Sequence, residues 1–264
     1  MTTVPHDPLA RELFEQIATW PIYDPHSHID ARRPAARNLD EVLGYHYYTE
    51  LAHSAGMPAA LVAPELEPRQ RARNLAAHLD RLDNTAQYSW LLEIARTFHG
   101  FEENAINPGN VDALYDRADH TADGPAWDEH VWTRTNLEAV FLTNEFDDPL
   151  EGWDRDRYIP CLRTDDLVLK LHDPLTRQRL LKASNVEVVD YPSLRLALGS
   201  LFSYFVTRGV RACAISLPPD FLPARPGPQR SGAAMRRALH GLDLRPDEHL
   251  EIRQLVFWTL AELC

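Results

Sequence analysis

Residues 137–163 read LEAVFLTNEFDDPLEGWDRDRYIPCLR, in which two short apolar runs flank an acidic turn. The runs at 137–143 and 158–162 have the length and composition of strands. A brief run at 21–24 and a longer one at 210–217 predict a strand before and a strand after this pair in the chain. The run at 210–217 is continuously apolar, which is typical of a parallel strand covered on both faces.

Helical patterns occupy the chain around these runs. Outside residues 66–134 they are expected at 8–19, at 41–55 after Asp40 as N-cap, at 174–183, at 191–208 and from Pro246 to the end. The last of these helices has one apolar face, which we expect to need a further packing partner. Five prolines between 218 and 228 predict an irregular loop.

Residues 66–134 differ from the rest of the chain because they show helical patterns and no strand candidate. The expected helices cover 69–81, 85–98, 109–118 and 125–134. This stretch is too long to be an ordinary connection between a strand and its neighbour, so we interpret it as a helical insertion after the first strand.

Strands that alternate with helices indicate right-handed βαβ units and a parallel sheet. A closed barrel of this kind needs eight strands, and the sequence predicts about four. The expected fold class is therefore α/β, a partial eightfold (β/α) TIM-type barrel of about four units. Residues 1–65 would hold the first helix, strand and following helix, 66–134 the insertion, and 135–264 the further βα units.

The composition is that of a globular protein, with 44% hydrophobic residues in 264. Acidic residues outnumber basic ones 39 to 27, a net charge of −12 that argues against nucleic acid as a partner. No run of 18 apolar residues and no signal peptide is visible, so we expect no membrane partner and a cytoplasmic location. Three widely spaced cysteines do not suggest a disulfide framework. A homo-oligomer is compatible with this composition.

His26 and His28 stand two residues apart at the end of the first expected strand. Side chains at this spacing in a strand point to the same side, so both imidazoles could bind one divalent metal. Twelve histidines in a chain of this length produce roughly 0.5 such pairs by chance, so the spacing alone is weak. The preceding apolar strand and the barrel end favour a metal site.

Three further residues are candidates for substrate contact. His46 and Tyr47 lie in the helix after the first strand, where they could contact a polar substrate or belong to a tyrosine-rich packing face. Arg163 follows the strand at 158–162 and could clamp a carboxylate with two hydrogen bonds. An ion pair with Asp165 or Asp166 is an equal alternative for it.

Two other groups of residues are weaker candidates for a functional site. The acidic segment 144–149 could bind metal or act as a base, but a turn after the strand explains it better. Cys213 and Ser216 lack an adjacent base and nucleophile-elbow glycines, so covalent acyl transfer has no support.

These pieces, in this order, resemble the uronate (glucuronate) isomerase family of the amidohydrolase superfamily. The resemblance rests on IYDPHSHI at 22–29, HY at 46–47 and YSWLLE at 88–93 followed by INP at 106–108. Most specific are TNLEAV at 135–140 and YIPCLRTD at 158–165. It spans about residues 20–264 and resembles the N-terminal part of the family.

The resemblance implies reversible aldose–ketose isomerisation of hexuronates, such as D-glucuronate to D-fructuronate. By the same resemblance His26 and His28 would hold a divalent metal, assigned as Zn²⁺. Tyr47, with His46 beside it, would contact the sugar, and Arg163 would bind the carboxylate of this small-molecule sugar acid. Tyr47 and Arg163 are the expected catalytic residues.

The sequence departs from the family in three ways. The turn NEFDD at 144–148 is longer than the usual Thr-Asp-Asp, and the fourth strand ends ISLP at 215–218 instead of Ser-Asp-His-Gly. Family chains are also much longer, so we expect an incomplete chain whose remaining metal ligand and base lie beyond Cys264. Two alternatives stay open: a divergent metal-dependent hydrolase, and an inactive fragment that serves only as an interaction module.

Overall fold

The computed structural model describes residues 7–264, which divide into two compact units. The helical unit takes the chain up to Pro21 together with residues 33–137. The sheet unit takes residues 22–32 and 138–264. Each unit is therefore built from two separate stretches of the chain, and the stretch that carries His26 and His28 belongs with the later strands.

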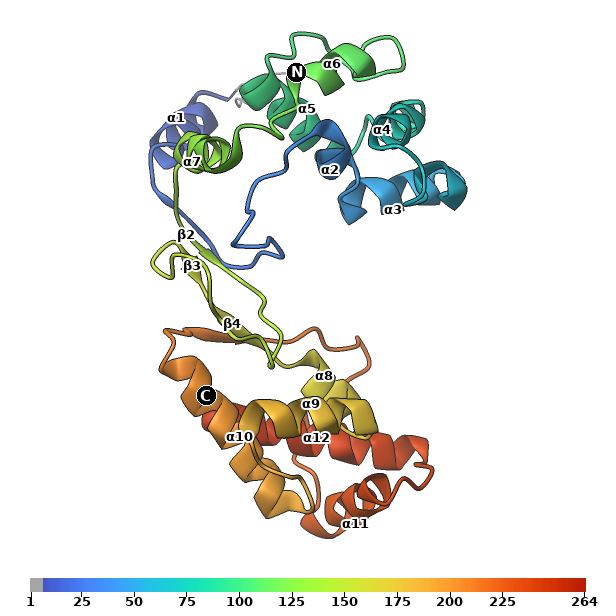
Figure 1. The fold of residues 1–264 in the computed structure, drawn as a ribbon, viewed down its shortest axis with the longest axis vertical. Coiled ribbons are helices and arrows are strands. Elements are labelled where there is room, and N and C mark those ends of the chain that lie inside the picture. Colours follow the sequence, from blue (N-terminus) through green and yellow to red (C-terminus); the bar gives the residue numbers. More distant parts are fainter. Residues whose placement is uncertain (1–6) are drawn as a thin grey trace. The chain divides into compact units, whose positions relative to one another are not determined.

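The helical unit contains seven α-helices within the described residues. They are α1 (Pro8–Ile17), α2 (Leu39–Leu43), α3 (His46–Ser54), α4 (Pro68–Ala76), α5 (Ala86–His99), α6 (Val111–Arg117) and α7 (Gly124–Thr135), with 3-10 turns at Ala59–Val62 and Leu79–Arg81 (Figure 1). The stretch 66–134 is helical and holds no strand, as expected.

The helix expected at 41–55 is in fact two helices, α2 and α3, and its expected N-cap is wrong. Asn38 caps α2, and its side chain accepts a hydrogen bond from the amide of Glu41 at 3.0 Å. Asp40 instead forms an ion pair with Arg71 of α4. Asp40 is the second residue of α2, so it lies inside the helix and does not stand at the position that an N-cap takes.

The core of the helical unit lies among α2, α4, α5 and α6. Leu39, Leu75, Leu91 and Leu114, one from each helix, are at most 1% exposed. Burial of four such side chains contributes about 1.5–3 kcal/mol each to the stability of this unit. No residue of α1 is buried, so the apolar positions along this helix remain exposed in the part of the chain described.

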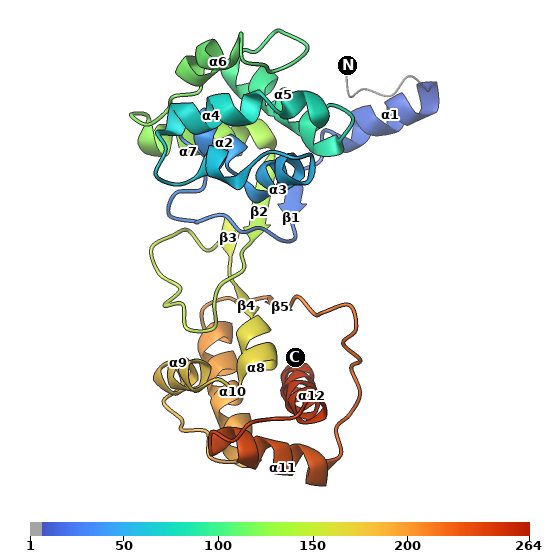
Figure 2. The same ribbon diagram turned by 90° about the vertical axis from the view of Figure 1, so that its right-hand side faces the viewer.

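The sheet unit contains the strands and five helices. The strands are β1 (Ile22–Asp24), β2 (Leu137–Phe141), β3 (Tyr158–Ile159), β4 (Cys161–Arg163) and β5 (Ala212–Ala214). The helices are α8 (Asp165–Lys170), α9 (Pro174–Ser184), α10 (Tyr191–Val206), α11 (Pro228–Leu239) and α12 (Pro246–Leu263) (Figure 2).

The strands run in the order β1-β2-β3, with β4 paired to β5. β2 and β3 are parallel, as are β4 and β5. The strand expected at 158–162 is divided at Pro160, which has no N–H to donate to a ladder. Asn144 joins the two sheets: its amide donates to Cys161 O at 3.0 Å, and its carbonyl accepts from the amide of Arg163 at 2.8 Å. The four predicted strand positions are therefore confirmed.

The expectation that the run at 210–217 is covered on both faces is wrong. Only Ala212–Ala214 is a strand, and Ala212 and Cys213 are exposed. Within the described residues β5 pairs with β4 alone and so lies at the edge of its sheet. An edge strand is exposed whenever no neighbouring strand covers it, whatever the apolar content of its sequence.

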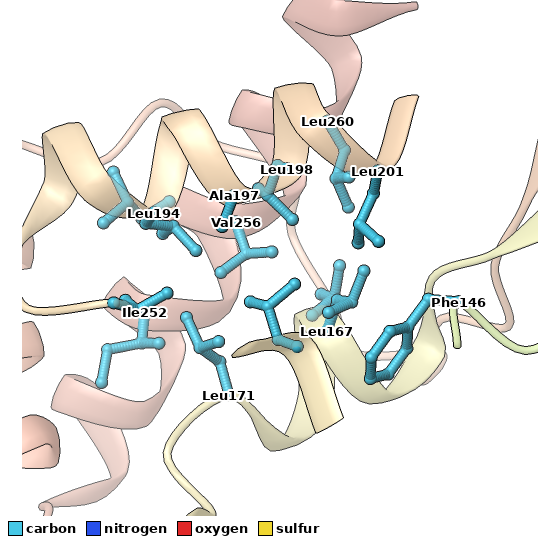
Figure 3. Packing of buried hydrophobic residues seen from close by; sticks show 14 of the residues in the cluster. Phe146, Leu167, Leu171, Leu194, Ala197, Leu198, Leu201, Ile252, Val256 and Leu260 are labelled. Carbon is cyan, nitrogen blue, oxygen red and sulfur yellow. The ribbon is translucent and has the colours of Figure 1, made fainter. Parts of the chain in front are cut away.

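A second core lies in the sheet unit, where α8, α10 and α12 meet (Figure 3). Leu167, Leu198 and Val256, one from each helix, are fully buried. The apolar face of α12 therefore has its packing partners, contrary to expectation. One of them is α11, a helix that was not expected from the sequence and that begins at Pro228, the last of the prolines that predicted an irregular loop at 218–228.

The described residues thus form an α/β structure of short parallel strands and many helices. No helix among residues 7–264 is long and apolar enough to cross a membrane.

Candidate metal and carboxylate site

His26 and His28 lie on the loop that follows β1. Their Nε2 atoms are 3.1 Å apart, and the ring centroids are 4.8 Å apart with the planes nearly perpendicular. The sequence predicted this convergence from strand alternation, but β1 ends at Asp24, so the pair lies beyond the strand. The loop is held instead by Asp24 Oδ1, which accepts from the amide of His26 at 3.1 Å, and by the amide of Ser27, which donates to Phe141 O at 2.9 Å.

Thr143 determines which nitrogen of His28 carries the proton. The hydroxyl of Thr143 donates to Ser27 O at 3.0 Å and lies 3.1 Å from His28 Nδ1. Because the hydroxyl proton is used on Ser27, Thr143 Oγ1 acts as acceptor toward His28, so Nδ1 bears the hydrogen. The lone pair of the neutral ring then lies on Nε2, the atom that faces His26.

This geometry fits two ligands of a divalent metal. Tetrahedral zinc with Zn–N bonds of about 2.0–2.1 Å separates two ligand nitrogens by about 3.3 Å, close to the separation of the two Nε2 atoms. A hydrogen bond to the second ring nitrogen is the usual way in which a metal-binding histidine is oriented. Within residues 7–264, no three histidine, cysteine, aspartate or glutamate side chains are placed to share one metal.

The chain beyond the two histidines is anchored by Arg32. Its Nη2 donates to Glu151 O at 2.5 Å, and its guanidinium lies 4.6 Å from the ring centroid of Trp153. Gly152 between them has φ of 90°, and a Cβ there would lie 3.1 Å from Arg32 Nε. The positive φ favours glycine at position 152, and the close approach of Arg32 leaves little room for a Cβ there.

A cavity of about 350 Å³ in the sheet unit brings the two histidines together with Arg163. Thr143, Asp165 and Ser216 also line it. Arg163 ends β4, where it stands opposite Ala214 of β5. The sequence-predicted metal pair and the predicted carboxylate ligand therefore share one cavity.

Arg163 is held by two carboxylates. Its Nε lies 3.3 Å from Asp165 Oδ2, and its Nη1 lies 3.3 Å from Glu145 Oε1. The pKa of Arg163 is raised, first by its hydrogen bond with Asp165 and further by the charges of Glu145 and Asp166. The ion pair with Asp165, one of the sequence alternatives, therefore exists, and it exists within the cavity.

Glu145 belongs to a larger charged network centred on Arg179 of α9. Arg179 Nη2 lies 3.2 Å from Glu145 Oε2 and 2.7 Å from Asp147 Oδ1, and Nη1 lies 2.6 Å from Asp166 Oδ2. These hydrogen bonds, that with Asp147 foremost, raise the pKa of Arg179, and Arg179 in turn lowers the pKa of Asp147. The segment 144–149, interpreted as a plain turn, is thus ion-paired to a helix.

The cysteines near the cavity are protonated. Burial raises the pKa of the Cys161 thiol to about 11. Cys213 is exposed as a residue, but the atoms packed around its sulfur and the neighbouring Cys264 raise the pKa of its thiol to about 12. Thiols with such pKa values are weak nucleophiles at neutral pH.

His46 and Tyr47 open α3 in the helical unit. Both are exposed, Tyr47 by 46%, and their ring centroids lie 4.4 Å apart. Tyr48, the next residue, is buried instead. Packing into a core therefore accounts for Tyr48 but not for His46 or Tyr47, whose contact with substrate stays a prediction.

Sequence reasoning missed Thr143 and Arg179 as parts of this site, and it considered Glu145 within the acidic segment 144–149 but favoured a plain turn. Thr143 lies two residues beyond the end of β2, and a residue that follows a parallel strand is a reasonable candidate for a site. Nothing in the sequence indicates that Glu145 pairs with Arg179. The two residues are 34 positions apart in the chain, and only the packing of α9 brings them together.

Comparison with known proteins supports a common fold. The crystal structure of glucuronate isomerase from Caulobacter crescentus matches with a TM-score of 0.85 at 21% identity, covering 98% of this chain and 59% of that one. Uronate isomerase from Thermotoga maritima matches with a TM-score of 0.82 at 18% identity, covering 96% and 59%.

Two relatives named uronate isomerase are similar in sequence. That of Nostoc punctiforme is 25% identical over 281 residues, and that of Streptococcus equi subsp. zooepidemicus is 23% identical over 288. Each match covers 97% of this chain but only 58% and 57% of the relative, so the chain spans somewhat more than half their length. The family model described as glucuronate isomerase matches residues 4–264, and the chain therefore belongs to the glucuronate isomerase family.

Proposed function

We propose that the chain is part of a uronate isomerase that interconverts hexuronate aldoses and ketoses, such as D-glucuronate and D-fructuronate. In this reaction the proton on C2 is transferred to C1 and the proton of the C2 hydroxyl to the oxygen on C1, so that C2 becomes a ketone and the aldehyde at C1 becomes an alcohol. The observation that carries the proposal is the shared cavity, in which the Nε2 atoms of His26 and His28 converge 3.1 Å apart and Arg163 lines the wall.

His26 and His28 would hold a divalent metal, with Zn²⁺ as the proposed ion. Such an ion supplies Lewis acidity that polarises a carbonyl or hydroxyl oxygen of the sugar. Thr143 keeps the hydrogen of His28 on Nδ1, so that Nε2 is available. Catalytic zinc usually takes three protein ligands, so we infer that the complete site draws a further ligand from sequence outside residues 7–264.

Arg163 would bind the carboxylate of the sugar acid, since a guanidinium is a natural partner for a carboxylate in a chain with a net charge of −12. His46 and Tyr47, whose rings are exposed at the start of α3, would contact the hydroxyl or aldehyde end. These roles derive from the family resemblance and from the exposure of the side chains.

The strand order supports a partial barrel as the fold of this chain. β1, β2, the divided strand β3–β4 and β5 follow one another in both sequence and space. We propose that they are four successive strands of an eightfold barrel, and that the exposed edge at β5 receives the next strand in a complete enzyme. Such an enzyme would act in the cytoplasm on a soluble sugar acid.

The test is isomerisation of D-glucuronate in D₂O by the zinc-loaded chain, alone and extended to the length of the family. NMR of the product shows deuterium at C1 if the proton that passes from C2 to C1 exchanges with solvent. The same spectrum detects any ketose that forms, with or without this exchange. We expect the extended protein to turn over and His26→Ala to abolish both turnover and stoichiometric zinc. Absence of ketose, or release of a hydrolysis product from an ester or lactone, would overturn the proposal in favour of the hydrolase alternative.

A further inference from the structure

The guanidinium of Arg163 has three nitrogens, and their surroundings differ. Nε faces Asp165 and Nη1 faces Glu145, each at 3.3 Å. Among the described residues, no carboxylate forms an ion pair with Nη2. An arginine binds a carboxylate with two hydrogen bonds only through a pair of neighbouring N–H groups, either Nε with Nη2 or Nη1 with Nη2. Each of these two edges is already partly occupied by a carboxylate of the protein.

The two protein carboxylates are not equally fixed. The Asp165 side chain is 14% exposed, and its Oδ1 accepts a hydrogen bond from the amide of Ser216 at 3.3 Å. The Glu145 side chain is 46% exposed. A buried carboxylate with a backbone donor is costly to move, whereas an exposed one exchanges partners readily. Glu145 is therefore the carboxylate that can leave Arg163.

Glu145 also has a second cation beside it. Its Oε2 lies 3.2 Å from Arg179 Nη2, so the carboxylate bridges the two arginines. Arg179 is fixed independently by Asp147 and Asp166, and its guanidinium lies 4.5 Å from the ring centroid of Phe146. When Glu145 releases Arg163, it therefore remains ion-paired, and the cost of the release is reduced.

We propose that Glu145 occupies the place on Arg163 that a ligand carboxylate takes, and that ligand binding transfers Glu145 entirely to Arg179. The inference rests on the proposed function, because it assigns Arg163 to the carboxylate of a sugar acid. The Nη1–Nη2 edge of Arg163 becomes available for two hydrogen bonds, while Asp165 keeps hold of Nε. Glu145 is thus a specificity-determining residue, since an uncharged ligand cannot replace its charge.

The experiment measures the dissociation constant of D-glucuronate by isothermal titration calorimetry at low ionic strength. We expect Glu145→Gln to bind about two- to fivefold more tightly than the wild type, the range that corresponds to one exposed ion pair. The matched control is Asp147→Asn, which removes the same charge from the same network but does not contact Arg163. It should change the affinity clearly less, and the affinity for D-glucose should not change in either variant.

Equal or weaker binding by Glu145→Gln, or an equal effect of Asp147→Asn, would overturn the inference. So would the absence of binding in both the wild type and Glu145→Gln. Arg163→Gln separates this failure from failure of the proposed function. If that variant binds D-glucuronate like the wild type, the carboxylate does not use Arg163 and the inference falls, whereas isomerisation is judged separately by the appearance of ketose.

Discussion

Thr143 Oγ1 lies 3.1 Å from His28 Nδ1 and so determines the tautomer of a proposed metal ligand. Hydrogen bonds of this kind typically change metal affinity by about 10- to 100-fold when they are removed. We expect Thr143→Val to weaken zinc binding by an amount in this range, because His28 can then place its proton on Nε2. Competition with a chromogenic chelator measures the affinity.

Thr143→Ser is the matched control, since it keeps the hydroxyl and removes only a methyl group. It should bind zinc within about threefold of the wild type, a difference of less than 1 kcal/mol. Equal zinc affinity in the valine and wild-type proteins would show that the hydroxyl does not set the tautomer.

Arg179 stabilises the sheet unit through Glu145, Asp147 and Asp166. The substitution Arg179→Met leaves three carboxylates without their shared cation. We expect it to lower the free energy of unfolding by about 1–2 kcal/mol at pH 7. The pKa of Asp147 is lowered chiefly by its hydrogen bond to Arg179, so this stability is present above the ordinary pKa and is lost as the pH falls through the lowered value.

Urea denaturation of Arg179→Met and wild type between pH 7 and pH 3 tests this prediction. The difference between the two proteins should shrink below about pH 4, where the acids of the unfolded chain are protonated. Lys182→Met removes a positive charge from an exposed position of the same helix and should cost less than about 0.5 kcal/mol. A difference that does not depend on pH would contradict an electrostatic role for Arg179.

His99 makes the helical unit sensitive to mild acid. Its side chain is buried, and its pKa is lowered to about 4, chiefly by desolvation and further by the charges of His120 and Arg117. Between pH 6.5 and 4 the unfolded chain binds a proton that the folded chain does not. The contribution of His99 to the free energy of unfolding is therefore fully present above pH 6.5. It decreases as the pH falls, and the loss reaches roughly 3 kcal/mol at pH 4.

The variant His99→Phe keeps an aromatic ring beside Trp127 but cannot titrate. Its denaturation midpoint should change less between pH 7.5 and pH 5 than that of the wild type. Circular dichroism with urea follows the unfolding, and parallel pH profiles for the two proteins would exclude His99 as the source.

Leu198 tests the core of the sheet unit. It is fully buried in α10 among side chains of α8 and α12 (Figure 3). Leu198→Ala removes these contacts and leaves a cavity, which should cost about 2–5 kcal/mol in the free energy of unfolding. Leu196→Ala lies on the same helix at a position that is 64% exposed, so it should cost less than about 0.5 kcal/mol. Similar losses for both would contradict this packing.

The strand positions could be predicted because short apolar runs bounded by turns identify strands locally. The length and the exposure of β5 could not be predicted, because both depend on which strands lie beside it. The same limit explains α11, which directly follows a proline-rich stretch and which the core of the sheet unit stabilises. Local patterns therefore located the strands and most of the helices, and tertiary contacts decided their extent.

The candidate site was partly predictable in the same way. The spacing of His26 and His28 indicated a metal pair, although the backbone contact between Ser27 and Phe141, not strand alternation, orients the loop. The partners of Arg163 could be only half identified, because Asp165 is a near neighbour in sequence and Glu145 is not. Charge networks between distant segments leave no periodic signal in a single sequence.

Asn144 is buried and connects the Thr143 end of β2 with the Arg163 end of β4 through main-chain hydrogen bonds on both its amide and its carbonyl. The backbones that carry Thr143 and Arg163 are therefore held at a fixed spacing. A ligand that contacts both the histidine pair and Arg163 must therefore have a length that these side chains can span from backbones held in place.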